Sequence, residues 1–143
     1  MAGRVHQINV SDGGVPKLPV PSAHLLAAGV EGDTQADRIH HGGPAQTVCL
    51  YSLEVIHALQ AEGHLIQAGA AGENLTLAGI EWTEVVPGVR LRVGEAALEI
   101  TFPATPCYKN AQWFVGGRFD RMHQSKHPGW SRMYARVIDE AEV

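Results

Sequence analysis

The chain has 143 residues, of which 45% are hydrophobic and 18% charged, and its formal net charge is −4. This length favours one domain with a single core, over residues 1–143, and the acidic balance argues against nucleic-acid binding, which depends on lysine and arginine. No segment approaches the roughly 20 apolar residues that span a bilayer, and the N-terminus has no apolar leader, so we expect a cytoplasmic protein that binds no membrane.

The first third of the chain is predicted to form short strands. Residues 4–10 are rich in β-branched side chains and are followed by a glycine turn. Residues 15–20 contain two prolines, which cannot donate to a central ladder, so we expect an edge strand or an extended loop there that presents Lys17. Residues 23–30 and 46–51 are expected to be further strands.

One clear helix is predicted at about 52–63. Ser52 is a good N-cap, Glu54 lies in the first turn near the positive end of the helix dipole, and the apolar stripe that follows ends at Gly63. This is the only long stretch with helical periodicity.

The rest of the chain alternates strands with turns, in keeping with its 16 glycines and 8 prolines. The expected strands are 74–77, 89–93, 96–102 and 133–138, and short helical segments are expected at 110–114 and 119–124. Short strands at even spacing are typical of a barrel or a sandwich. We therefore predict a mainly β, barrel-like domain.

The segment between the expected strands 23–30 and 46–51 has the composition of a binding site. It contains Asp33, His40, His41, Gly42 and Gly43. Glycine allows a backbone to approach a ligand closely, and carboxylate and imidazole groups supply charge and hydrogen bonds. Adjacent side chains of an extended chain point to opposite faces, so one histidine would face a ligand and the other would support it. The alternative is a glycine-rich turn with aspartate caps.

Gly72, Glu73 and Asn74 form a second candidate cluster at the entry to a strand. The glycine allows close approach, and the other two offer an acceptor and a bifunctional amide. The alternative is a simple turn between a loop and a strand.

The two cysteines, Cys49 and Cys107, are too few for a disulfide framework and too far apart for a zinc ribbon. Cys49 is expected in the middle of a strand, in the core. Cys107 follows a strand and precedes Lys109, a cation within reach that would favour the thiolate, so it is either reactive or structural.

A fourth cluster is the pair His123 and His127, whose spacing would place both imidazoles on one helix face as metal ligands. Pro128 follows directly and disfavours helical geometry at His127.

Taken in order, these motifs resemble the MOSC domain, named after the C-terminal domain of molybdenum cofactor sulfurase. The matching residues are Gly14-Val15-Pro16-Lys17, Gly32-Asp33, Asp37, His40-His41-Gly42-Gly43-Pro44, Gly72-Glu73-Asn74-Leu75-Thr76 and Pro106-Cys107. The resemblance covers nearly the whole chain. It implies a β-barrel of the pyruvate-kinase type, and some members are molybdenum cofactor enzymes that reduce N-hydroxylated compounds such as hydroxylaminopurines and amidoximes.

The resemblance also implies roles for particular residues. Cys107 would ligate molybdenum or carry sulfur, because a thiolate is both a soft ligand and a nucleophile. Asn74 matches a pterin contact with Glu73 beside it, and Lys17 matches a loop near the cofactor phosphate. The loop residues Asp33, His40, His41, Gly42 and Gly43 would line the pocket.

The chain also departs from the family pattern. Some relatives carry an arginine just ahead of the cysteine, whereas Ala104, Thr105 and Pro106 precede it here, so an anion contact on that side must come from elsewhere. The sequence has no sign of a pyridoxal-phosphate domain. We therefore do not expect pyridoxal phosphate on this chain.

Three functions remain open. The first is a molybdenum enzyme that acts on a small molecule, receives electrons from a separate electron-transfer protein, and takes a proton from His40 or His41. The second is a carrier that holds the cofactor, or sulfur from a cysteine desulfurase, on Cys107. The third is a zinc-dependent hydrolase with ligands among His40, His41, His123 and His127.

Overall fold

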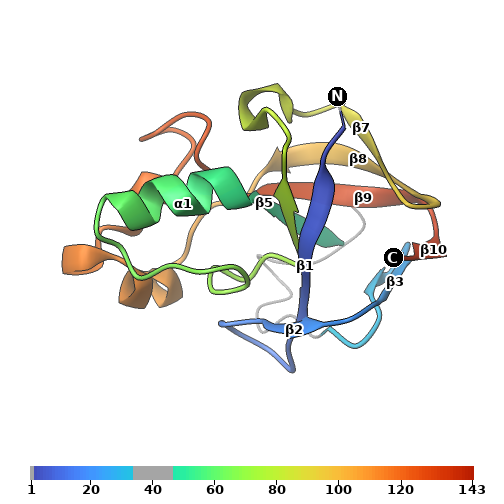
Figure 1. Cartoon of the computed structure of the whole chain (residues 1–143), viewed down its shortest axis with the longest axis horizontal. Coiled ribbons are helices and arrows are strands. Elements are labelled where there is room, and N and C mark those ends of the chain that lie inside the picture. The colour runs from blue at the N-terminus through green and yellow to red at the C-terminus, as the bar shows by residue number, and fades with distance from the viewer. Residues whose placement is uncertain (1, 34–46) are drawn as a thin grey trace.

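The computed structural model describes residues 2–33 and 47–143 (Figure 1). His40, His41, Gly42 and Gly43 lie outside the described residues, and so do the roles predicted for them. The description that follows concerns the described part of the chain.

A seven-stranded mixed sheet forms the body of the molecule and confirms the mainly β fold class (Figure 1). Its strands, in spatial order, are β2 (Leu18–Val20), β1 (Arg4–Val10), β6 (Leu75–Ala78), β5 (Val48–Ser52), β9 (Met133–Asp139), β8 (Ala96–Pro103) and β7 (Arg90–Val93). Only β5 and β6 run parallel among these neighbours. A parallel pair needs a crossover, which the helix between these two strands provides.

The strand predicted over 23–30 is divided in two. β3 (His24–Leu26) and β4 (Gly29–Val30) pair antiparallel, and β10 (Ala141–Glu142) pairs with β3 to complete a three-stranded sheet. Gly29 has a φ of 138°, which glycine adopts without strain and which lets the chain reverse there. The prediction of a single strand was therefore wrong, because a turn interrupts this apolar run.

The predicted helix is confirmed as α1 (Leu53–Ala61). The Ser52 hydroxyl accepts a hydrogen bond from the Val55 amide at 3.2 Å, as expected for an N-cap. The helix ends at Ala61 with Glu62 as its C-cap, and Gly63, the next residue, takes a φ of 96°. Its buried side chains, which include Ile56 and Leu59, pack into the core with those of the central strands.

Several short 3-10 helices, rather than α-helices, connect strands of the sheet, one between β6 and β7 and the others between β8 and β9. They are η2 (Trp82–Glu84), η3 (Tyr108–Trp113), η4 (Val115–Gly117) and η5 (Phe119–Met122). Gly116 and Gly117 both have positive φ, which interrupts regular helix between the last three. None of the helices in the described ranges is long and apolar enough to cross a bilayer.

Candidate functional site

Asn74 joins three parts of the fold just before β6. Its amide N–H donates to the Cys49 carbonyl at 2.7 Å, and its side-chain Oδ1 accepts from the Cys49 amide at 3.0 Å. Its Nδ2 group donates to the Asn9 carbonyl at 3.2 Å and to Asp33 Oδ2 at 2.9 Å. The side chain is buried, so this residue type is required to satisfy β1 and β5 together.

Lys17 and Asp33 form a buried ion pair beside Asn74. Nζ of Lys17 lies 2.6 Å from Asp33 Oδ2, and the two side chains are only 8% and 5% exposed. Asp33 Oδ1 accepts a further hydrogen bond from the Ser11 amide at 2.9 Å. The sequence suggested Lys17 and Asp33 as separate ligand contacts, but their side chains form an ion pair with each other.

Glu73, the residue directly before Asn74, is fully buried. Its Oε2 accepts from the Gly69 amide at 2.9 Å and from the Thr76 hydroxyl at 2.8 Å, whereas Oε1 has no hydrogen-bond partner among the described residues. Burial raises the pKa of this carboxyl, against the opposing effect of those two donors. We call Lys17, Asp33, Glu73 and Asn74 the polar network.

Arg132 is a site residue that sequence reasoning missed. It is 5% exposed and directly precedes β9. Nη1 donates to the Ala71 carbonyl at 2.9 Å and Nη2 to the Thr105 carbonyl at 3.3 Å, while Nε has no partner among the described residues. These two carbonyls lie two residues before Glu73 and two before Cys107. Arg132 thus clamps the segments that carry both motifs.

A signal for Arg132 was present in the sequence. It is a lone arginine at the start of an apolar strand, where a charge needs a specific partner. The cation that the sequence lacks just ahead of Cys107 is supplied at the Thr105 carbonyl by this distant residue.

Cys107 is half-buried, has no disulfide partner, and stands directly before η3. Its carbonyl accepts from the amide of Asn110, a buried residue whose side-chain Oδ1 has no partner in the described part of the chain. The ammonium of Lys109 forms no ion pair with a described residue, so its predicted effect on the thiol stays a prediction.

Cys49 is confirmed as a core residue, 5% exposed in β5. Burial raises the pKa of its thiol, and the nearby guanidinium of Arg132 opposes that shift only in part. The two cysteines therefore differ in access and in environment.

The predicted histidine pair does not share a helix face. η5 ends at Met122, and His123 has an extended backbone. His123 Nδ1 accepts from the Ser125 amide, and the ring of His127 packs edge-on against Trp130 with centroids 4.2 Å apart. Within residues 2–33 and 47–143 no three metal-ligating side chains gather, so the zinc hydrolase gains no support there.

The chain is similar to known proteins over most of its length. The model of the MOSC domain matches residues 37–143. The protein YflK of Bacillus subtilis (strain 168), described as uncharacterized, is 37% identical over 134 residues, which cover 91% of this chain and 59% of YflK. Protein YiiM of Escherichia coli (strain K12) is 34% identical over 124 residues, 81% of this chain and 54% of YiiM.

Solved structures show the same fold. The crystal structure of YiiM from Escherichia coli superimposes with a TM-score of 0.73 at 26% identity and covers 100% of this chain and 65% of its own. The crystal structure of a hypothetical protein gives a TM-score of 0.78 at 29% identity, over 100% of this chain and 64% of its own. The chain thus spans less than two thirds of the length of each of these relatives.

Proposed function

This chain belongs to the MOSC domain family, and from that premise we propose that it binds the molybdenum cofactor and reduces N-hydroxylated compounds with electrons from a separate protein. One observation supports the proposal above the others. Three buried polar atoms around the two motifs, Glu73 Oε1, Asn110 Oδ1 and Arg132 Nε, have no partner among the described residues. Buried polar atoms are rarely left so, and two more in the described ranges are Trp113 Nε1 and His127 Nδ1. A polar ligand would satisfy the three near the motifs once the segments that cover them open to admit it.

The residues present fit such a ligand. The Cys107 thiol is free and half-buried, and as a thiolate it is a soft ligand suited to a high-valent metal. A pterin carries both hydrogen-bond donors and acceptors, so the unpartnered carboxyl and amide oxygens and the guanidinium N–H match it in kind. When bound, the molybdenum centre would supply the oxygen-atom and electron chemistry, which no side chain can perform.

The chain itself would bind the cofactor and orient it. Cys107 would hold the metal, and the clamp of Arg132 on the Thr105 carbonyl would fix the backbone that presents the thiol. The polar network would keep Asn74 in place, since its amide is committed to Asp33 and Asn9. Lys17 is also committed to Asp33, so it would reach a phosphate only through its remaining N–H groups. His40 or His41 would supply a proton in this proposal.

Metal and pterin analysis tests this function. The protein is purified from a host that synthesises the cofactor, together with Cys107→Ser and the matched control Cys49→Ser. We expect about one molybdenum and one pterin per chain in the unmodified protein and in the control, and loss of both from Cys107→Ser. Stoichiometric metal in Cys107→Ser, or none in the unmodified protein, would overturn the proposal.

A second candidate, a sulfur carrier, is favoured by the accessible and unpaired state of Cys107. Its thiolate would attack the persulfide of a cysteine desulfurase, forming a persulfide on Cys107 and releasing the desulfurase thiolate. Cyanide-labile sulfur on the protein after incubation with a desulfurase and cysteine, absent from Cys107→Ser, would support the carrier over the enzyme.

A further inference from the structure

A groove of about 630 Å³ lies apart from Cys107, between α1, β1, the start of β2 and the segment 65–70. This volume is within the range of about 300–1,000 Å³ that is usual for small-molecule sites. Its apolar wall includes Ile56 on α1, Leu65 and the half-buried ring of Trp113 at the end of η3. The wall can therefore take a flat apolar group.

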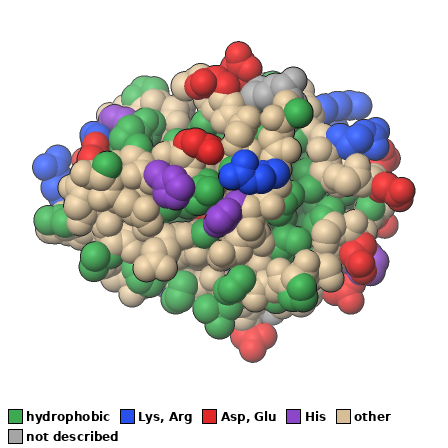
Figure 2. All heavy atoms as spheres, viewed as in Figure 1, with side chains coloured by type: hydrophobic (Ala, Val, Ile, Leu, Met, Phe, Trp, Pro, Cys, Tyr) green, Lys and Arg blue, Asp and Glu red, His purple; other side chains and the backbone are tan. Residues whose placement is uncertain are grey.

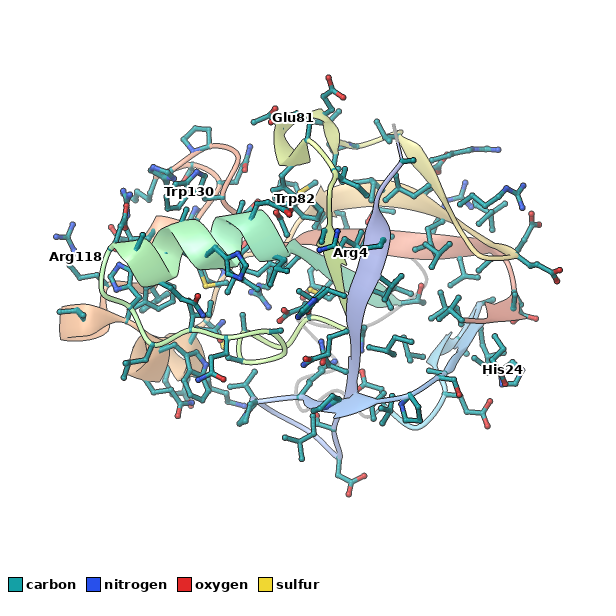
Figure 3. All side chains as sticks on the ribbon, in the orientation of Figure 1. Arg4, His24, Glu81, Trp82, Arg118 and Trp130 are labelled. Carbon is teal, nitrogen blue, oxygen red and sulfur yellow. The ribbon has the colours of Figure 1, made fainter. Side chains whose placement is uncertain are left out.

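Two histidines stand on the polar side of the groove. His6 on β1 and His57 on α1 both line it, both are exposed, and neither forms a hydrogen bond or ion pair with another described residue. Figure 2 shows two histidine side chains beside a basic side chain on this face, and Figure 3 shows Arg4 reaching from β1 towards α1 in the same place. Free imidazoles beside a cation suit a ligand with negative charge.

Glutamines supply unused acceptors in the same groove. Gln7 donates its amide N–H groups to Asn9 Oδ1 and to the Ala68 carbonyl, and Gln60 donates to the Ile66 carbonyl at 2.9 Å. The side-chain oxygens of both are left free to accept an N–H or O–H from a ligand, as far as the described residues show.

The charges around the histidines are few. No aspartate, glutamate or arginine lines the groove among the described residues, and the one lysine, Lys17, is neutralised by Asp33. Of the two flanking elements, β1 carries Arg4, labelled in Figure 3, and α1 carries Glu54, whose carboxylate accepts from the Gly79 amide at 3.1 Å. Arg4 therefore supplies a permanent positive charge on this face, with His6 and His57 in the groove.

We propose that this groove is a second binding site, for a small organic anion with a flat apolar body and an N–H donor. The body would lie against Trp113, Leu65 and Ile56, the donor would reach a glutamine oxygen, and the acid group would face His6 and His57. Cys107 does not line the groove, and η3 separates it from Trp113 by about 12 Å at roughly 2 Å per residue. Lys17 lines the groove and also belongs to the polar network, so the two sites adjoin there.

Three compounds that share the indole ring and differ in charge test the site: indole-3-acetate, indole-3-acetamide and tryptamine. Their binding to the ¹⁵N-labelled full chain is followed by NMR and calorimetry at about pH 6 and about pH 8, the range over which imidazoles titrate. We expect the acetate to bind tightest, about tenfold more tightly at the lower pH, the size of two weak exposed ion pairs. The amide should show no such dependence, and the shifted resonances should be those of the groove.

Variants assign the effect to residues. His6→Gln combined with His57→Gln should abolish the pH dependence for the acetate. His24→Gln should leave it unchanged, because this exposed histidine lies on β3 in the three-stranded sheet, well away from α1 (Figure 3). Trp113→Leu should weaken all three probes at both pH values. The proposal is overturned if no probe binds, if the three bind equally, or if the double variant retains the pH dependence. None of these readouts needs the cofactor or Cys107.

Discussion

The two thiols of this chain lie in regions with opposite properties. Cys49 is the second residue of β5, 5% exposed, in a strand that is hydrogen-bonded on both sides, and it lies near the guanidinium of Arg132. Cys107 is half-buried on a connection, where a strand has ended and a 3-10 helix begins. Loops tolerate accessible reactive groups and sheet interiors do not, because a buried thiol is kept neutral and out of reach.

Arg132 contacts both regions, so the two thiols can be compared around a single buried cation. It donates to the Thr105 carbonyl near one thiol, and its charge lies beside the other. The same buried cation therefore supports a rigid core on one side and positions an accessible loop on the other.

The largest expected effect is on thiol labelling. In the native protein iodoacetamide should modify Cys107 at least about a thousandfold faster than Cys49, because a central strand opens only with most of the fold. Mass spectrometry of the singly labelled protein, with Cys107→Ser and Cys49→Ala as assignments, measures both rates. Equal rates would show that the two environments are not different in solution.

Lys17→Met should cause the largest loss of stability. It leaves the Asp33 carboxylate buried without its cation, at a cost of about 3–5 kcal/mol in the free energy of unfolding. Urea unfolding measures this, and Cys49 labelling should accelerate in parallel. Lys126→Met, an exposed lysine, is the matched control, and Asp33→Asn added to Lys17→Met should recover part of the loss. A loss below about 1 kcal/mol would mean that the pair is not buried in solution.

Arg132→Met should cost somewhat less, roughly 2–4 kcal/mol. The buried hydrogen bond to the Ala71 carbonyl and the part-buried one to the Thr105 carbonyl are both lost, at about 1–3 kcal/mol for a buried acceptor and less for the other, and the removal of a buried cation offsets part of this. Amide hydrogen exchange should rise at Ala104 and Asn110 beyond what the lower global stability explains. Unchanged relative protection there would contradict the clamp, and Arg132→Lys should restore only part of it.

Ser52→Ala should have the smallest effect, about 1 kcal/mol, because the amide of Val55 loses its N-cap. Since Ser52 ends β5 and begins α1, labelling of Cys49 should become about fivefold faster while that of Cys107 keeps its rate. Ser52→Thr retains the hydroxyl and is the control. An equal increase at both thiols would show that they share one opening event.

Much of the fold could be predicted because it depends on neighbours in the sequence. Ser52 marks the start of α1 by a contact three residues away, and β-branched residues mark β1. The predictions failed where an apolar run contains a turn, as at Gly29, and where glycines limit a helical stretch to 3-10 turns, as at Gly116. In both places one glycine conformation outweighs the pattern around it.

The candidate site was predictable only in part. Lys17, Asp33, Glu73 and Asn74 were selected as ligand contacts, and the structure brings all four together. Their partners could not be foreseen, because the carboxylate that neutralises Lys17 and the amide that meets Asp33 are distant in the sequence and meet only through the sheet order.

By itself, the sequence determined the mainly β class, the capped helix, the family motifs and which cysteine lies in a strand. The tertiary structure alone decided that Arg132 joins the Ala71 and Thr105 segments, and that His6 and His57 face one groove. The physical reason is the separation along the sequence between the residues that make each kind of contact. Caps, turns and alternation are contacts within a few residues, whereas the pairing of β1 with β6 and of β5 with β9 sets which distant side chains share a buried space.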